Sequence, residues 1–322
     1  MNDAATPAQL VLTATVARRY YLDDRSKVEI AEEFGLSRFK VARLLDSARA
    51  SGLVQIEIGY PGGIDVQRSS RLQEAYRLRH AIVIDSNDDH AAALRRRLGE
   101  AAAQLLTEVV TSGDVLGLAW ARSVSAMAGA LIRLPAIPVV QLTGALSRPD
   151  ADDSSIEVVR KVARVSGGPA YFFYAPLIVG DAGTARALRR QPEVARAFDQ
   201  LPSVTKAVVG IGLCEPGQST VYDALDEREQ QVLRRLGVCA DISGILLKAD
   251  GGPVHAELSD RIIGVNAAQL RPVPEVLAIA YGQAKAPAVR AALTSGLVNA
   301  LVTDAALADV LLASPDPVPT AR

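Results

Sequence analysis

Cysteine and histidine are scarce in this chain of 322 residues, which contains only Cys214, Cys239 and three histidines. Two cysteines are too few for the disulfide framework of a small secreted domain, and this favours the cytoplasm as the compartment. Zinc sites usually need three or four cysteine, histidine or carboxylate ligands, so a multi-histidine metal site is not expected. We predict neither a metal nor a cofactor.

Long apolar runs are also lacking, since none reaches the roughly 18 residues that a membrane-spanning helix needs. Residues 1–9 are polar and small, without the charged and then apolar layout of a signal peptide. The net charge is −1 at pH 7, so no overall field points to nucleic acid. We therefore predict no membrane partner, and any signal for DNA binding must be local.

The length of 322 residues predicts two domains, because domains usually contain about 100–200 residues. Residues 10–50 repeat apolar side chains at helical spacing. Residues 54–58 alternate like a short strand, and residues 60–63 then form a Tyr-Pro-Gly-Gly break. We place the boundary there, with a small all-α domain at residues 1–59 and a larger domain at residues 60–322.

The strongest local pattern runs from residue 27 to residue 46 and is typical of a helix-turn-helix. Such a motif needs a small residue where its helices cross, and Ala31 provides it. The turn needs a residue that tolerates positive φ, and Gly35 follows four residues later. The second helix needs apolar residues that face inward, and Val41 and Leu44 have that spacing. An ordinary helical hairpin is the alternative.

Basic residues gather on the second helix of this motif, for which Ser37 is a natural N-cap. Between Gly35 and Gly52 there are four basic residues against Asp46 alone. A recognition helix places its outward face in the major groove, where phosphates and guanine edges attract cations. A solvated surface charge is the alternative for each single residue. The residues predicted to contact double-stranded operator DNA are Ser37, Arg38, Phe39, Lys40 and Arg43.

Beyond residue 65, short apolar runs alternate with helical stretches rich in Ala, Leu and Arg. This alternation is typical of a parallel sheet covered on both faces, so we predict an α/β fold with a Rossmann-like, largely parallel sheet. The predicted strands are 81–84, 114–118, 138–142, 171–174, 204–211, 262–265, 276–281 and 299–302. The main predicted helices are 91–111, 123–134, 153–166, 226–236, 285–296 and 304–313.

The pattern of residues 113–124 predicts a strand, a tight loop and the start of a helix. A helix start presents free N–H groups and the positive end of the dipole, so such a loop suits an anion, above all phosphate. Ser123 adds a hydroxyl group and Arg122 a positive charge. By spacing alone, a plain strand-to-helix turn capped by serine fits these residues at least as well.

Residues 12–58 resemble the N-terminal domain of the SorC family of sugar-responsive transcriptional regulators, and residues 50–56, Ala-Ser-Gly-Leu-Val-Gln-Ile, look like that family's exit from the recognition helix. Six further segments resemble the family's effector domain, in the same order along the chain. They are Val-Val-Gln-Leu-Thr-Gly (139–144), Tyr-Ala-Pro-Leu (174–177), Val-Val-Gly-Ile-Gly (208–212), Cys-Ala-Asp-Ile-Ser-Gly (239–244), Gly-Gln-Ala-Lys (282–285) and Leu-Val-Thr-Asp (301–304). The resemblance covers about residues 12–313.

This resemblance implies a fold similar to the sugar-phosphate isomerase and deaminase group, with a phosphorylated sugar as the usual effector. The loop Ala121, Arg122, Ser123 and Val124 matches the family's phosphate-binding loop. Glycine and threonine are usual in that loop where Ala121 and Ser123 stand, so the close approach of a phosphate is in doubt. An effector without phosphate, a sugar or a polyol, therefore stays open.

Four more positions are implied by the same resemblance to lie at the effector. Lys285 matches a ligand-facing lysine, and Asp241 lies in the segment near the sugar. Gln141 and Gly144 lie at the end of a strand that borders the same pocket. In the simplest alternative, Asp241 caps a turn and Lys285 is a solvated residue at a helix start.

The predicted function is that of a DNA-binding transcriptional regulator whose operator affinity is controlled by a small carbohydrate. The alternative is a sugar-phosphate isomerase or deaminase with an appended DNA-binding module. That chemistry needs a general base and a proton shuttle, and the loops offer Asp241 without an evident His or Glu partner, so we predict no enzyme activity and no catalytic residue. One helix-turn-helix covers one half-site, so we expect a homodimer or a homotetramer.

Overall fold

The computed structural model describes residues 6–54, 63–85, 90–146 and 154–313. The chain divides into two compact units, Met1–Ile58 and Gly59–Arg322. The predicted boundary between residues 59 and 60 lies outside the described residues, as does most of the predicted strand at 54–58. No helix within the described ranges combines the length and the apolar character that crossing a membrane requires.

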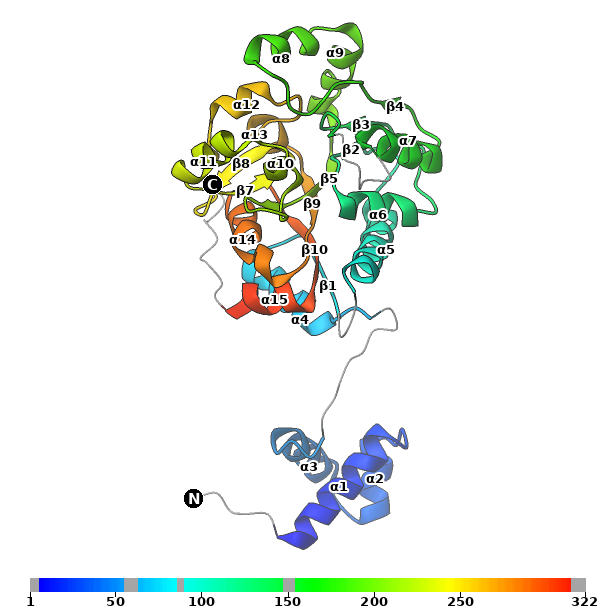
Figure 1. The fold of residues 1–322 in the computed structure, drawn as a ribbon. Helices are drawn as coiled ribbons and strands as arrows, with labels where there is room; N and C mark the ends of the chain where they lie inside the picture. Colours follow the sequence, from blue (N-terminus) through cyan, green and yellow to red (C-terminus); the bar gives the residue numbers. More distant parts are fainter. Residues whose placement is uncertain (1–5, 55–62, 86–89, 147–153, 314–322) are drawn as a thin grey trace. The chain divides into compact units, whose positions relative to one another are not determined.

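Three helices form the N-terminal unit: α1 (Pro7–Tyr21), α2 (Lys27–Phe34) and α3 (Arg38–Ala50) (Figure 1). Their apolar faces meet in a small core. The buried members of that core are Val16, Ala17, Ile30, Ala31, Val41, Leu45 and Ala48. The predicted small residue at the crossing, Ala31, and the predicted inward residue Val41 both lie in this core.

Local hydrogen bonds explain where the helices of this unit begin and end. Ser26 begins α2 by accepting from the backbone N–H of Glu29, and Ser37 begins α3 in the same way. Gly35 ends α2 at φ +61°, a left-handed conformation that glycine adopts without strain. The chain therefore turns sharply between α2 and α3, as the helix-turn-helix pattern predicts.

Seven parallel strands form the main sheet of the second unit, in the order β1-β10-β9-β5-β2-β3-β4. From β2 the chain continues to β3 and β4 on one side, and from β5 it continues to β9 and β10 on the other. Open parallel sheets bind ligands at such a switch point, beyond the carboxyl ends of the strands. The strands are β1 (His80–Ile84), β2 (Leu116–Leu118), β3 (Val139–Gln141), β4 (Ala170–Tyr171), β5 (Lys206–Gly210), β9 (Glu275–Ile279) and β10 (Ala300–Asp304).

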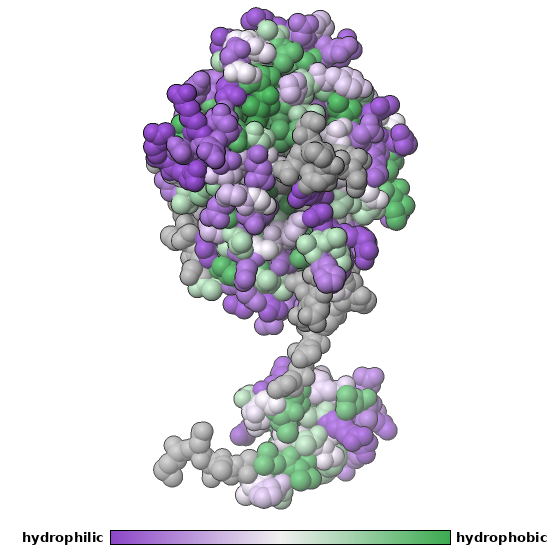
Figure 2. Space-filling model, in the orientation of Figure 1, coloured by the Kyte–Doolittle hydropathy of each residue, from purple (hydrophilic) through white to green (hydrophobic). Residues whose placement is uncertain are grey.

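Helices cover both faces of this sheet (Figure 1). One face packs against α5 (Ala91–Val109), α6 (Arg122–Ala130) and α7 (Ser155–Ser166). The other packs against α4 (Val66–Tyr76), α14 (Ala286–Thr294) and α15 (Ala305–Ala313). Hydrophilic side chains predominate on the visible surface of this unit in Figure 2, since the helices turn their apolar sides to the sheet. The predicted α/β fold with a largely parallel sheet is confirmed.

A smaller antiparallel sheet follows β5 and has the order β6-β7-β8. Its strands are β6 (Gly212–Leu213), β7 (Val238–Ile242) and β8 (Ile245–Lys248). The remaining elements are α8 (Ala182–Arg189), α9 (Pro192–Phe198), α10 (Thr220–Asp223), α11 (Glu227–Arg235), α12 (Glu257–Arg261), α13 (Ala267–Leu270) and 3-10 turns at Leu201–Ser203 and Gln283–Lys285.

One predicted strand in this part of the chain is wrong, and one hairpin was not predicted. Residues 262–265, predicted as a strand, form only isolated bridges, of Ile262 with Ile178 and of Gly264 with Thr143. The hairpin of β7 and β8 is not among the predicted strands, although its two-residue turn has the positive φ values typical of hairpins. Burial of a segment by neighbouring loops gives the same apolar pattern as burial in a sheet, so the pattern could not separate the two.

The turn between α2 and α3 generates a prediction about stability. Gly35→Ala should lower the free energy of unfolding of the N-terminal unit by about 1–2 kcal/mol, because a side chain is strained at positive φ. Hydrogen exchange of the α2 and α3 amides measures that free energy. Gly113→Ala is the control. The backbone of Gly113 is not at positive φ, and no atom lies within 4 Å of a Cβ added there. Equal protection in both variants would contradict the prediction.

Candidate functional site

The residues predicted to contact DNA lie together at the start of α3. Ser37 is the N-cap, and the side chains of Arg38, Phe39, Lys40 and Arg43 are exposed, opposite the core-facing side of the helix. None of the three cations, Arg38, Lys40 and Arg43, has an ion-pair partner among the described residues. The acidic residue of the helix, Asp46, is paired with Arg49. The face therefore presents unneutralised positive charge.

A cavity of about 590 Å³ opens at the switch point of the main sheet. Four segments that follow neighbouring parallel strands line it: residues 120–123 after β2, residues 143–144 after β3, residues 210–212 at the end of β5 and residues 281–285 after β9. A fifth wall comes from residues 217–221 and from the hairpin of β7 and β8. The sheet topology thus brings together segments that are far apart in the sequence.

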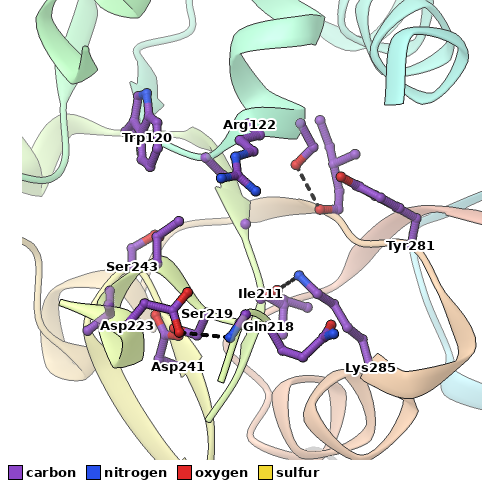
Figure 3. A pocket seen from close by; sticks show the side chains of 18 of the residues that line it. Trp120, Arg122, Ile211, Gln218, Ser219, Asp223, Asp241, Ser243, Tyr281 and Lys285 are labelled. Atoms are coloured by element: carbon purple, nitrogen blue, oxygen red, sulfur yellow. Dashed lines mark hydrogen bonds between the residues drawn. The ribbon is translucent and has the colours of Figure 1, made fainter. Parts of the chain in front are cut away.

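The start of α6 forms one side of this cavity. Ala121 is its N-cap residue, and its methyl side chain makes no capping hydrogen bond to the first N–H groups of α6. The buried Ser123 donates its hydroxyl hydrogen to the carbonyl oxygen of Ile279 at 3.0 Å. The hydrogen of this hydroxyl group is therefore already used, so the hydroxyl oxygen can only accept a hydrogen bond from a ligand. Figure 3 shows Trp120 and Arg122 on this side, with the guanidinium group of Arg122 directed toward the cavity.

Asp241 lies on the opposite side of the cavity in Figure 3, beside Ser243. Only 4% of the residue is exposed, and burial raises the pKa of its carboxyl group. Ser219 donates a hydrogen bond of 2.5 Å to its Oδ2 atom. Gly212 makes room for this arrangement, since a Cβ atom there would lie 2.1 Å from the same oxygen.

Lys285 occupies a third position in the wall, at the end of the 3-10 turn that precedes α14. Its Nζ atom donates to the carbonyl oxygen of Ile211 at 3.0 Å and lies 5.9 Å from the centre of the Tyr281 ring. Burial lowers the pKa of Lys285; the negative charge of Asp241 opposes this shift, and the positive charge of Arg122 adds to it. The cavity thus combines two cationic groups with one buried carboxyl group.

Two of the predicted effector residues do not line the cavity. Gln141 is buried within β3, where its amide group bonds the carbonyl oxygen of Thr143 and the hydroxyl of Ser155 and its carbonyl oxygen accepts from Phe173. Val124 is fully buried in the core between the sheet and its helices. The other six, Ala121, Arg122, Ser123, Gly144, Asp241 and Lys285, do line it.

Comparison with known proteins gives consistent matches over most of the chain. Residues 63–313 match the family model described as "Putative sugar-binding domain". The chain is 32% identical to the transcriptional regulator YjhU of Escherichia coli K12, over 91% of this chain and 92% of that relative. It is 30% identical to the transcriptional regulator LsrR of Klebsiella pneumoniae, over 95% of this chain and 94% of that relative.

A solved structure shares the fold over nearly the whole length. The full-length sorbitol operon regulator SorC of Klebsiella pneumoniae superposes with a TM-score of 0.72 at 22% identity, over 95% of this chain and 99% of that chain. The chain belongs to the SorC family. As a member it is a DNA-binding transcriptional regulator that responds to a sugar, and the relatives named here are regulators rather than enzymes.

Most residues that line the cavity were not predicted as ligand residues of this SorC-family chain. Among them are Trp120, Gln218, Ser219, Ser243 and Tyr281. Trp120 and Tyr281 lie directly beside predicted segments, so extending each segment by one residue would have included them. Gln218 and Ser219 carry no local signal, because only the fold of the small sheet brings them to Asp241.

The buried carboxyl group of Asp241 predicts a pH dependence of stability. Because burial raises its pKa in the folded chain, its contribution to stability is fully present below the unfolded pKa and is lost as pH rises through the folded pKa. Asp241→Asn keeps an acceptor for Ser219 and cannot ionise. The variant should therefore gain stability relative to the parent as pH rises from about 4, the unfolded pKa of aspartate. Urea unfolding of both proteins between pH 4 and 8 measures this, and parallel profiles would rule it out.

Proposed function

We propose that this regulator contacts operator DNA through Ser37, Arg38, Phe39, Lys40 and Arg43, and that a carbohydrate with a phosphate group controls this contact from the cavity. The observation that carries the proposal is the division of charge in the cavity. The start of α6 and the guanidinium group of Arg122 face it from one side, the acceptor group of Asp241 faces it from the other, and Lys285 lies at a third position in the wall.

The cationic side fits the phosphate group. The N–H groups at the start of α6 and the guanidinium group of Arg122 offer hydrogen bonds and positive charge to an anion. Ala121 stands where glycine is usual in the family, but its methyl group lies against Gly210, where an added Cβ atom would be 2.5 Å away. The glycine at 210 therefore makes room for the methyl group of Ala121.

The other side fits the hydroxyl groups of a carbohydrate. The carboxyl group of Asp241 has only partial hydrogen bonding, from Ser219 at 2.5 Å and from the backbone of Gly244 at 3.4 Å. Sugar hydroxyl groups donate well to carboxylate oxygens, and such a bond would favour the charged form that burial disfavours. Ligand binding is therefore expected to be coupled to ionisation of Asp241.

We further propose that the site binds its ligand without converting it. Isomerase or deaminase chemistry needs a general base and a proton shuttle within reach of the substrate. No histidine lines the cavity among the described residues, and its carboxyl groups are Asp241, already bonded to Ser219, and the exposed Asp223. As a DNA-binding regulator the protein would act in the cytoplasm, as a homodimer or homotetramer that presents two recognition helices to paired half-sites.

A series of hydrogen bonds leads from the cavity wall to α4, the first helix of the larger unit. The N–H of Gly282, in the wall, donates to the carboxylate of Asp304 at 2.9 Å, and Asp304 directly precedes α15. From α15, the carbonyl oxygen of Leu311 accepts from the buried hydroxyl of Tyr76 in α4. An effector that moves the 282–285 turn would shift α15 and, with it, α4.

The same two helices are joined again at the start of α4. The guanidinium group of Arg68 bonds both carboxylate oxygens of Asp309 in α15, at 2.8 and 3.1 Å, and bonds Asp65 at 2.5 Å. Asp65 is the N-cap of α4 and lies three residues after the segment 55–62 that precedes this unit's described part. We propose that this contact transmits the effector's signal toward the DNA-binding unit.

Lys285→Met tests the effector site. The parent should gain about 2.7 kcal/mol of stability at a hundredfold excess of ligand over its Kd, and the variant should gain almost none. A thermal-shift screen with sugars and sugar phosphates measures the gain, and Lys248→Met, an exposed lysine at the end of β8, is the matched control. Product formed from the same ligand by the parent and lost in the variant would establish the isomerase or deaminase alternative instead.

Asp309→Ala tests the transmission route. The Asp309 side chain is 56% exposed, so its loss should leave the fold and the effector affinity nearly unchanged. The effector-induced change in DNA affinity should shrink by about 0.5–2 kcal/mol. Fluorescence anisotropy of labelled operator with and without effector measures this, and Glu100→Ala, which removes the exposed pair with Arg96 in α5, is the control. An unchanged effector response in Asp309→Ala would exclude the route.

A further inference from the structure

Phe39 is the most exposed large apolar side chain of α3, with 84% of its surface accessible. Single exposed apolar residues are common and usually need no explanation. This one lies in the first turn of the helix, directly between the cations Arg38 and Lys40. A bulky aromatic ring there is unfavourable in water, and its position on the face proposed to meet DNA suggests a role in base recognition.

Helix geometry places Phe39 at the centre of that face. Each residue advances by about 100° around the axis, so Phe39 lies roughly 160° from the core residue Val41 and Arg43 lies at a similar angle on the other side. Arg38 and Lys40 lie at roughly 60° and 100° from Val41, on opposite flanks. The centre of the face thus carries one aromatic ring and one guanidinium group, and the flanks carry the other two cations.

These positions correspond to different parts of the major groove. Side chains on the flanks of a recognition helix face the phosphate backbones, whereas side chains at its centre face the edges of the bases. The base edges offer one apolar group in the major groove, the C5-methyl group of thymine. Guanine offers two acceptors that a guanidinium group can bond at once, which suits Arg43.

We infer that Phe39 determines sequence specificity by packing against the C5-methyl group of a thymine in each half-site. The inference rests on the proposed DNA-contacting face and adds the base that the face selects. The ring excludes water from the methyl group on binding, while Arg38 and Lys40 hold the flanking phosphates. Cytosine at the same position lacks the methyl group and is discriminated against.

Selection of binding sites by the full-length chain from a random pool of duplex DNA tests this inference, whatever the operator sequence is. The selected half-sites should share a thymine, and its replacement by deoxyuridine should weaken binding about fourfold, the factor expected for one buried methyl group. Phe39→Ala should bind the thymine and deoxyuridine duplexes equally. Leu22→Ala removes another exposed apolar side chain of the same unit, 74% accessible and outside α3, and should keep the fourfold discrimination.

The outcomes separate this inference from the proposed function. If the parent selects no DNA sequence, the proposed function itself fails. If it selects sequences without a shared thymine, or if Phe39→Ala still discriminates thymine from deoxyuridine, only the inference fails. A change in oligomer mass of Phe39→Ala by light scattering, with discrimination intact, would assign Phe39 to a contact between copies of the chain and would overturn the inference.

Discussion

The reversal of strand order between β2 and β5 is the constraint on which the proposed effector site depends. Parallel strands all end at the same edge of the sheet, and at the reversal the following loops diverge to opposite sides. The cavity is the space that this divergence leaves. Its polar groups come from four strand ends and from the small sheet that follows β5, so no single segment could form the site alone.

The cavity keeps buried polar groups that folding alone would not favour. Asp241 and Lys285 both lie in surroundings that disfavour their charged forms. Asp241 accepts hydrogen bonds from Ser219 and from the backbone of Gly244, and Lys285 donates one to the carbonyl oxygen of Ile211. A ligand with a phosphate group and hydroxyl groups would supply partners for both sides at once. An effector of that class could therefore bind with a free energy large enough to bias two arrangements of the protein, which is the requirement for control.

The proposed route from the cavity toward the DNA-binding unit passes through α15 and α4. The 282–285 turn bonds Asp304, and α15 then meets α4 through Tyr76 and Arg68. Both partners of the Arg68–Asp309 pair are partly exposed, so the pair contributes little to stability and can change at small cost. A weak contact of this kind suits a regulatory element better than a tightly buried one.

The sequence by itself determined the features that depend on local spacing. The cap Ser37, the left-handed Gly35 and the inward Val41 identify the helix-turn-helix, because each acts within one or two helical turns. Strand–helix alternation likewise determined the parallel sheet, and the segments that follow its strands located six of the eight predicted effector residues in one cavity.

Only the tertiary structure decided which way individual side chains point and which distant loops meet. Gln141 bonds inward to Thr143 and Ser155, although it lies beside residues that line the cavity. Ser219, at the start of α10, bonds Asp241 in β7, a strand that the apolar pattern did not reveal. Local periodicity reports that a residue is buried, but its partners are set by strand order and register over long separations, which are properties of the folded chain.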